Sequence, residues 1–291
     1  MESKTPFEKL LALMLEKTGL DCRKYNEPYI KRRLNSRFLS NGLGPADYEA
    51  YIKILGTVQA ESRELYNALT VNVTQFFRDA KMWEVLRTDV LPKIIAKLQR
   101  PAANGKRPGP AGAPVLNVWS CGCSSGEEPY SLAILLKELA GARQSFVPAV
   151  IATDIDDLSL ERAASGIYGA ASLATAPAEY VARYFKRTEA GAEAKFELDS
   201  SVKSLVRFRK HNFFDEPAPV TGLDLILCRN VFIYFKTESK DKLLQTFHAA
   251  LKEDGFLVMG KSEVLFTANF KDKFFLYNSD ERIYGKGECH G

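Results

Sequence analysis

The second part of the chain alternates short apolar runs with amphipathic segments, and this pattern constrains the fold more than any other feature. The apolar runs cover residues 115–120, 149–153, 223–228 and 256–259. Segments with helical periodicity lie at residues 129–139, 158–165 and 238–251. Strands that alternate with helices form a doubly wound, mostly parallel sheet, so we expect an α/β fold. The C-terminal residues read as two strands around a turn at 279–280, which would add an antiparallel edge.

Two segments do not fit this alternation. Residues 100–114 read RPAANGKRPGPAGAP, with four prolines and three glycines, which predicts a flexible surface loop. Within about residues 184–211, KFEL and LVRFRKH have the pattern of short antiparallel strands around a polar turn. We therefore expect a small β insertion there.

Residues 1–70 read as helices instead. Apolar side chains recur at helical spacing within residues 7–15, 30–38, 48–55 and 65–69. Gly19 is a natural helix stop, and Pro28 is favoured in the first turn of the next helix. We expect a helical domain of residues 1–70 before an α/β domain of residues 71–291.

Composition excludes several classes of protein. Hydrophobic residues make up 46% of the chain and charged residues 26%, which is ordinary for a globular protein. No apolar run approaches the roughly 20 residues of a membrane span, and no signal peptide is visible, so we expect a cytoplasmic protein without membrane insertion. Five cysteines without framework spacing and three scattered histidines argue against a disulfide scaffold and a metal site. The net charge of +4 does not imply a nucleic acid partner.

The first chemical motif is VLNVWSCGCSSGEEPYSLAILL, which predicts a strand, a glycine-containing loop and a helix. Gly122 and Gly126 would let the backbone turn tightly and approach a ligand. Glu127 and Glu128 stand where a pyrophosphate would need the helix N-terminus, so the loop suits a cationic group such as an ammonium or a sulfonium. Alternatively, both glutamates only stabilise the helix dipole.

Acidic residues also follow the next apolar run, in AVIATDID. Asp154 is placed to accept two hydrogen bonds from a ribose diol, which is how such folds recognise a nucleoside. Asp156 and Asp157 are expected to cap the following helix. An aspartate at a strand end is common, so this signal is weak alone.

The third motif, LDLILCRNVFIYF, places Arg229, Asn230 and Tyr234 after a buried strand. It lacks the Asn/Asp-Pro-Pro-aromatic motif of amino methyltransferases, which argues against a nucleobase acceptor. The fourth, NVTQFFRD at residues 72–79, joins the helical and α/β parts. It could line a cleft there, or it could be a packed linker with Phe76 and Phe77 in the core.

Together these motifs resemble the signature of the chemotaxis-receptor methyltransferases, the CheR family. The resemblance rests on N-x-T-x-F-F-R, W-S-x-x-x-S-x-G-E-E-P-Y-S, D-I-D and C-R-N-V-x-I-Y-F, and it extends over essentially the whole chain, including the closing GKSE segment at residues 260–263. It implies a fold of the class I S-adenosylmethionine methyltransferase type. Two departures are a longer loop at residues 100–114 and a β insertion whose turn lacks glycine.

The resemblance also implies roles for particular residues. The positions that match the family's contacts to S-adenosylmethionine are Asn72, Thr74, Arg78, Glu127, Asp154, Asn212, Phe213, Arg229 and Asn230. Arg78 and Tyr234 match the positions nearest the transferred methyl group. The reaction would give a glutamate methyl ester and S-adenosylhomocysteine, and no metal is expected. Because a glutamate is already ionised at neutral pH, no general base is required.

The implied partners are the glutamate-rich cytoplasmic helices of chemotaxis receptors. Arg33 and Arg37 lie one helical turn apart within a locally basic segment, and they could bind such a helix; a solvated basic face is the alternative. We expect a monomer that is recruited to membrane receptor arrays. In some members the β insertion binds a receptor tail peptide, which the glycine-poor turn argues against here.

Two rival functions remain at this stage. One is a regulator that binds S-adenosylmethionine without catalysis, which the presence of Arg78 and Tyr234 disfavours. The other is a methyltransferase for a different acceptor, such as a small-molecule carboxylate or a nucleic acid.

Overall fold

The computed structural model describes residues 4–70, 72–100, 112–141, 145–188, 194–264, 270 and 273–287. The chain forms two compact units. The helical unit comprises Met1–Val71 and Tyr234–Lys240, and the sheet unit comprises Asn72–Ile233 and Asp241–Gly291. Most of the proline-rich segment predicted as a surface loop lies outside the described residues.

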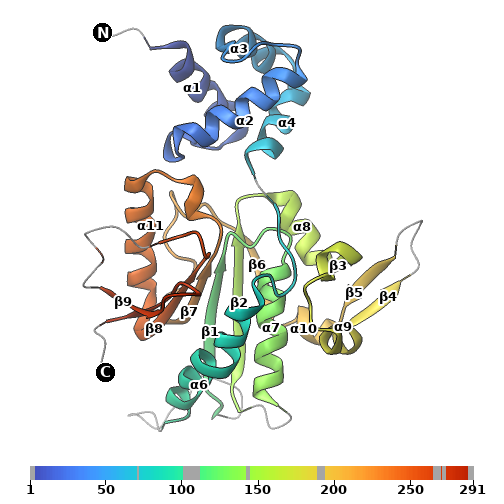
Figure 1. The fold of residues 1–291 in the computed structure, drawn as a ribbon, viewed down its shortest axis with the longest axis vertical. Helices are drawn as coiled ribbons and strands as arrows, with labels where there is room; N and C mark the ends of the chain where they lie inside the picture. The colour runs from blue at the N-terminus through green and yellow to red at the C-terminus, as the bar shows by residue number, and fades with distance from the viewer. Residues whose placement is uncertain are drawn as a thin grey trace. The chain divides into compact units, whose positions relative to one another are not determined.

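Four helices form the first part of the helical unit (Figure 1). They are α1 (Pro6–Thr18), α2 (Glu27–Ser40), α3 (Tyr48–Thr57) and α4 (Gln59–Leu69). Thr5 and Glu8 form a capping box at the start of α1, and Gly19 ends this helix in the left-handed conformation. The predicted apolar stripes are buried: Ile30, Leu34 and Phe38 of α2 are each at most 1% exposed.

An ion pair joins α2 to α4 inside this unit. The guanidinium of Arg37 donates to both carboxylate oxygens of Glu61, at 2.9 and 2.6 Å, and the Tyr51 hydroxyl donates to Glu61 as well. Burial alone would raise the pKa of Glu61, but hydrogen bonds from Arg37 and Tyr51 outweigh it and hold the pKa below 4.5. The network therefore links three helices through one nearly buried carboxylate.

The sheet unit is built on seven strands in the order β6-β2-β1-β7-β8-β10-β9. Their bounds are β1 (Val115–Cys121), β2 (Val147–Asp154), β6 (Val206–Lys210), β7 (Leu223–Cys228), β8 (Leu251–Met259), β9 (Phe274–Asn278) and β10 (Ile283–Lys286). The pairs from β6 to β8 are parallel, and β10 pairs antiparallel with both β8 and β9. The predicted doubly wound sheet with an antiparallel edge is thus confirmed.

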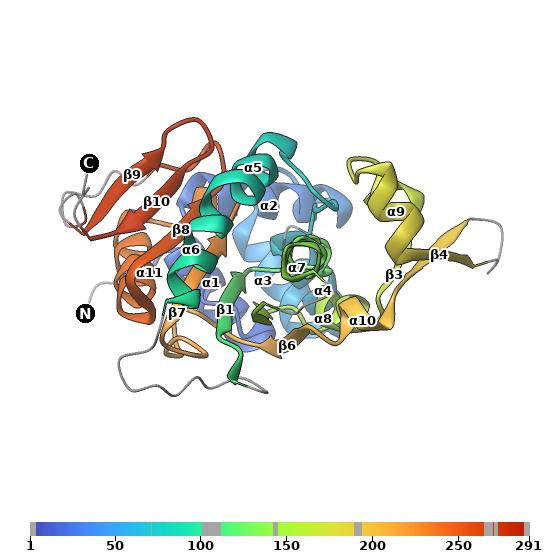
Figure 2. The same cartoon turned by 90° about the horizontal axis from the view of Figure 1, so that it is seen from below.

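Helices cover both faces of this sheet. The helices of the unit are α5 (Ala80–Val85), α6 (Leu91–Gln99), α7 (Glu127–Ala140), α8 (Asp157–Ser165), α9 (Ala178–Tyr184), α10 (Ser200–Lys203) and most of α11 (Thr237–Ala250). Figures 1 and 2 show α6 and α7 on one face and α11 on the other. Side chains of β1 alternate accordingly: Val118 belongs to the core with α6 and α7, whereas Trp119 packs on Phe247 of α11.

The small β insertion differs from the prediction. A three-stranded antiparallel sheet has the order β3-β5-β4, formed by Ile167–Gly169, Lys195–Leu198 and Phe185–Thr188. KFEL is indeed part of it as β5, but VRFRK is β6 and pairs in parallel with β2 in the main sheet. The segment taken as the insertion's turn contains α10 instead, and the chain from β4 to β5 runs through residues 189–194. The glycine-poor stretch between β5 and β6 is therefore not the turn of the insertion.

In the part of the chain that the structure describes, no helix has the length and apolar character needed to cross a membrane.

The Arg37–Glu61 pair gives a prediction for stability. Glu61→Gln should lower the free energy of unfolding by about 1.5–3 kcal/mol at pH 7, the range for hydrogen bonds to a charged group. Because the folded-state pKa of Glu61 is lowered, this stabilisation is complete above about 4.5 and is lost as the pH falls through the lowered pKa. Denaturant titrations of both proteins between pH 3 and 7 measure the difference.

Glu64 supplies the matched control, because its carboxylate lies 3.7 Å from the same guanidinium but is 55% exposed. Glu64→Gln should cost less than about 1 kcal/mol. Equal costs for the two substitutions would contradict the role of the buried pair.

Candidate functional site

The carboxyl ends of β1, β2 and β7 meet at one edge of the sheet. Cys121 at the end of β1 lies in register with Thr153 of β2, and Cys228 ends the neighbouring strand β7. After β1 the backbone N–H groups of Gly122 and Cys123 donate to the Thr153 carbonyl at 2.8 and 3.0 Å. The loops that carry the predicted cofactor residues after these strands are thus neighbours.

Two glycines shape the loop between β1 and α7. Gly122 and Gly126 have φ angles of +73° and +95°, which disfavour any other residue. A Cβ atom on Gly122 would lie 2.8 Å from a methyl group of Val231, and one on Gly126 would lie 2.9 Å from the Cβ of Ala163. These glycines let the loop approach other parts of the same chain, a requirement that the sequence interpretation had assigned to a ligand.

Asp154 is held at the end of β2 by backbone groups. Its Oδ2 accepts a hydrogen bond from the Ser124 N–H at 2.8 Å, and its Oδ1 accepts one from the Asp156 N–H at 3.0 Å. Each carboxylate oxygen has a further lone pair, so two hydroxyl groups could still donate to it. Burial raises the pKa of Asp154, against the lowering effect of these N–H groups.

Asn72 lies beside this carboxylate. Its Nδ2 donates to Asp156 Oδ2 at 2.9 Å, and its Oδ1 accepts from the Ser124 hydroxyl at 3.4 Å. Asp156 also caps α8, as predicted, through the Leu158 N–H. Asn72 thus ties the segment 72–79 to the end of β2, two residues from Asp154.

The rest of this segment combines packing with a basic group. Phe76 and Phe77 are at most 4% exposed and belong to the core, as the packed-linker alternative proposed. Thr74 and Arg78 are only partly buried. The Arg78 guanidinium donates to the Val73 carbonyl at 3.0 Å, so this side chain folds back over its own segment.

The two glutamates at the start of α7 have different partners. Glu127 is 3% exposed and accepts hydrogen bonds from the hydroxyls of Ser125 and Ser172, at 2.8 and 3.1 Å. Glu128 accepts from Ser120 and from Arg229. Burial raises the pKa of both carboxyls despite these hydrogen bonds.

Arg229 is enclosed by partners within the chain. Its guanidinium is 4% exposed and lies 3.2 Å from Glu128 and 2.5 Å from Asp79. It also donates to the Arg78 carbonyl at 3.2 Å. This side chain therefore joins the segment after β7 to α7 and to the end of segment 72–79, rather than standing open toward a ligand.

Three further predicted residues lie on loops of the sheet unit. Asn230 has a φ angle of +60°, and its N–H donates to Glu263 at 2.9 Å. Asn212 makes hydrogen bonds within its own turn. Its Nδ2 donates to Asp215 at 2.7 Å, and its Oδ1 accepts from the Phe214 N–H at 3.1 Å. Phe213 is partly buried beside Phe214.

The remaining predicted residues belong to the helical unit. The Tyr234 ring lies 4.6 Å from the Tyr29 ring, and its carbonyl accepts from the Asn26 N–H at 2.8 Å. The Arg33 guanidinium lies 5.4 Å from the Tyr29 ring, within cation–π range. Arg37 is engaged with Glu61, as described above. The proximity of Tyr234 to Arg78 stays a prediction.

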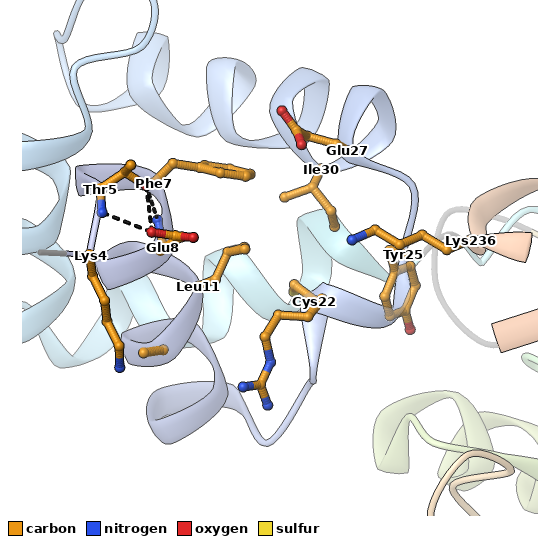
Figure 3. A pocket seen from close by; sticks show the side chains of 12 residues that line it. Lys4, Thr5, Phe7, Glu8, Leu11, Cys22, Tyr25, Glu27, Ile30 and Lys236 are labelled. Atoms are coloured by element: carbon orange, nitrogen blue, oxygen red, sulfur yellow. Dashed lines mark hydrogen bonds between the residues drawn. The ribbon is translucent and has the colours of Figure 1, made fainter. Parts of the chain in front are cut away.

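The helical unit also contains a cavity of about 590 Å³ (Figure 3). Phe7, Leu11 and Ile30 give it apolar walls, and basic side chains also line it, from Lys4, Arg23 and Lys236. Its two carboxylates are already engaged, since Glu8 caps α1 and Glu27 pairs with Lys31 at 2.6 Å. Its lining includes none of the residues predicted to bind the cofactor.

Three residues that bond to the predicted site residues were not predicted from the sequence. Ser124 and Ser172 bond to the predicted site residues Asp154 and Glu127, and Glu263 bonds to Asn230. Serine carries little sequence signal on its own. Glu263, however, stands in the GKSE segment that formed part of the family resemblance, and this could have marked it for attention.

Comparison with known proteins assigns the class. The model of the CheR methyltransferase S-adenosylmethionine-binding domain matches residues 72–283, and that of the CheR all-α domain matches residues 5–70. The sheet unit is thus an S-adenosylmethionine-binding domain of the methyltransferase class. The chain as a whole belongs to the CheR methyltransferase family.

Two chemotaxis protein methyltransferases are similar to the chain over most of their length. The chain is 31% identical to a chemotaxis protein methyltransferase of Borreliella burgdorferi, covering 90% of this chain and 89% of that protein. It is 33% identical to one of Salmonella typhimurium, covering 88% and 83%. Among solved structures, a TehB-like S-adenosylmethionine-dependent methyltransferase from Corynebacterium glutamicum covers 71% of this chain and 93% of that chain, at 14% identity and a TM-score of 0.35.

The enclosed guanidinium of Arg229 gives the second prediction. Arg229→Met should lower the free energy of unfolding by about 3–5 kcal/mol, because it leaves Glu128 buried without its cation. Adding Glu128→Gln should restore at least about 1 kcal/mol, since the uncompensated charge is then removed. Arg183→Met is the control, because the Arg183–Glu138 pair has a guanidinium that is 57% exposed. A cost for Arg229→Met no larger than that of the control would contradict the structural role.

Proposed function

We propose that this protein transfers the methyl group of S-adenosylmethionine to glutamate side chains of chemotaxis receptors, giving glutamate methyl esters and S-adenosylhomocysteine. The observation that carries the proposal is the group of buried and partly buried carboxylates at the carboxyl ends of β1 and β2, in a chain of the CheR methyltransferase family. Glu127, Glu128 and Asp154 all belong to this group.

Electrostatics support a cationic cofactor at this edge. Arg229 compensates Glu128, whereas Glu127 bonds only to neutral hydroxyls among its described partners. A sulfonium and an ammonium group would supply positive charge that compensates the negative charge of the Glu127 carboxylate. In the proposal Glu127 accepts a hydrogen bond from the ammonium group, and Asp154 accepts two from the ribose. The surrounding residues would be Asn72, Thr74, Asn212, Phe213 and Asn230.

In this proposal Arg229 supports the cofactor site indirectly and does not contact the cofactor itself. Because its guanidinium is enclosed by Glu128, Asp79 and the Arg78 carbonyl, it would support the cofactor through these groups. Its contact with Arg78 is to the backbone. The Arg78 guanidinium donates one hydrogen bond to the Val73 carbonyl, and its further N–H donors would act on the acceptor.

The chemistry needs positioning more than proton transfer. An ionised glutamate attacks the methyl carbon, the carbon–oxygen bond forms as the carbon–sulfur bond breaks, and two opposite charges disappear. Water stabilises the charged reactants more than the partly neutral transition state, so a dry, aligned site speeds the reaction. Alignment can contribute roughly 7–11 kcal/mol in favourable cases. Arg78 would orient the acceptor carboxylate, and Tyr234 would donate to it or shape its pocket.

The receptor helix would approach through α2. Arg33 is the candidate contact there, since Arg37 is engaged with Glu61 and its side chain is only 16% exposed. A cation on this face would attract the acidic helix and set its register. The reason for doubting tail-peptide binding no longer applies, because it concerned a turn that does not join β4 and β5.

The acceptor group can be identified directly. The protein, methyl-labelled S-adenosylmethionine and a receptor cytoplasmic fragment are incubated, and the receptor is then treated with alkali. We expect most of the label to leave as volatile methanol, because esters hydrolyse and N-methyl groups do not. A receptor fragment with alanine in place of its acceptor glutamates is the control. Label that resists alkali would indicate another acceptor, and binding without any transfer would indicate a regulator.

Cofactor binding should depend on pH through Glu127. Because burial raises the pKa of Glu127 above 4.5 in the free protein, the carboxyl is protonated over part of the acid range. Affinity for the cationic cofactor should therefore rise as the pH increases through this raised pKa and then level off. Glu127→Gln should reduce this rise to the part that comes from Asp154, whose pKa burial also raises, and should weaken binding at pH 7 by about 1.5–3 kcal/mol, or roughly 10–150-fold.

Calorimetric titration with S-adenosylmethionine from pH 4.5 to 8 measures both effects. Glu138→Gln is the control, since Glu138 lies near the other end of α7 and pairs with Arg183. An unchanged affinity and pH profile in Glu127→Gln would remove this residue from the cofactor site.

A further inference from the structure

Glu263 is a buried carboxylate that accepts hydrogen bonds from several backbone N–H groups among the described residues. It follows β8 and is 3% exposed. Its Oε2 accepts from the N–H groups of Gly260 and Asn230, at 2.7 and 2.9 Å, and its Oε1 accepts from that of Ile233 at 3.3 Å. The Phe232 N–H is a further backbone donor to this carboxylate. Such a carboxylate fixes the positions of these donors relative to one another.

The donors Asn230 and Ile233 bracket the segment that follows β7. Asn230 adopts a φ angle of +60°, which is uncommon for a residue other than glycine and needs support from its surroundings. The hydrogen bond from its N–H to Glu263 provides such support. Glu263 thus holds both ends of residues 230–233.

This segment leads directly into Tyr234. The chain passes from the sheet unit to the helical unit between Ile233 and Tyr234. On the helical side the Tyr234 carbonyl accepts from the Asn26 N–H at 2.8 Å. Glu263 therefore holds the N–H of Ile233, the residue before Tyr234, and Asn26 holds the carbonyl of Tyr234 itself.

Gly260 makes room for this arrangement. A Cβ atom on Gly260 would lie 2.8 Å from both the Asn230 nitrogen and Glu263 Oε2. No real side chain tolerates such distances, so the absence of a Cβ at Gly260 is a condition for the contact between Glu263 and Asn230.

We propose that Glu263 is a positioning residue for methyl transfer, which acts by fixing residues 230–233 and through them the hydroxyl of Tyr234. The inference rests on the proposed function, in which Tyr234 lies at the acceptor carboxylate. Glu263 itself touches neither the cofactor nor the acceptor.

Glu263→Gln is the diagnostic substitution. It keeps the size of the side chain but replaces one acceptor oxygen by an NH₂ group, which cannot accept from an N–H. One of the two anchor points, at Asn230 or at Ile233, must then be lost. Glu281→Gln is the matched control: Glu281 is also 3% exposed in the sheet unit, but its carboxylate forms an ion pair with Lys261, at 3.1 Å.

A double-mutant cycle with Tyr234→Phe tests the inference. Glu263→Gln should lower kcat by at least about tenfold in the wild-type background, and by less than about threefold when Tyr234 is already Phe, because the two residues act as one unit. Glu281→Gln should change kcat by less than about twofold in both backgrounds. An equal loss from Glu263→Gln in both backgrounds would overturn the inference, because a general structural defect reduces activity whether or not the hydroxyl is present.

Amide hydrogen exchange provides a readout that does not depend on activity. The peptide that spans residues 229–234 should exchange at least about tenfold faster in Glu263→Gln than in the wild-type protein, and should be unchanged in Glu281→Gln. Unaltered exchange there would also overturn the inference.

Failure of the wild-type protein to label any glutamate would refute the proposed function alone. The exchange experiment would still test whether Glu263 holds residues 230–233. If Glu263→Gln does not fold, Gly260→Ala disturbs the same contact, with the same expected exchange and kcat results.

Discussion

One buried guanidinium, that of Arg229, joins the three chain segments on which the candidate site is built. Arg229 follows β7, Glu128 lies in the first turn of the helix after β1, and Asp79 ends the segment that leads into α5. These residues are far apart in sequence, so the folded sheet must bring them together before the pairs can form. Once formed, they hold two acidic groups near the carboxyl edge without exposing a free cation there. The positions of Arg78 and Glu127, which are direct neighbours of these residues in sequence, depend on this arrangement.

The second constraint is an excess of buried and partly buried carboxylates at the same edge. Burial raises the pKa values of Glu127, Glu128 and Asp154, which means that the fold stabilises their charged forms incompletely. Carboxylates with raised pKa values are enriched at ligand-binding and catalytic sites. A sulfonium cofactor with an ammonium group has the complementary charge, and the family of the chain is one that binds S-adenosylmethionine.

Much of this arrangement could be predicted from the sequence, for identifiable reasons. The order of strands and helices followed from hydrophobic periodicity, and the cap at Asp156 from local chemistry. The strand β6 was misplaced because its alternating pattern reflects an edge strand with one polar side, and periodicity does not reveal which strand it pairs with. The roles of Arg37 and Arg229 were equally inaccessible, since their partners Glu61 and Glu128 are distant in sequence and a basic residue looks the same whether it is solvated, paired or bound to substrate.

The central claim is that the cofactor lies at the carboxyl ends of β1 and β2, with its ribose on Asp154 and its ammonium group on Glu127. A crystal structure of the protein with S-adenosylhomocysteine tests this most directly. The account predicts both ribose hydroxyls within hydrogen-bond distance of the Asp154 carboxylate and the amino group within that distance of Glu127. Density for the product elsewhere, such as in the cavity of the helical unit lined by Phe7 and Ile30, with Asp154 and Glu127 uncontacted, would contradict it.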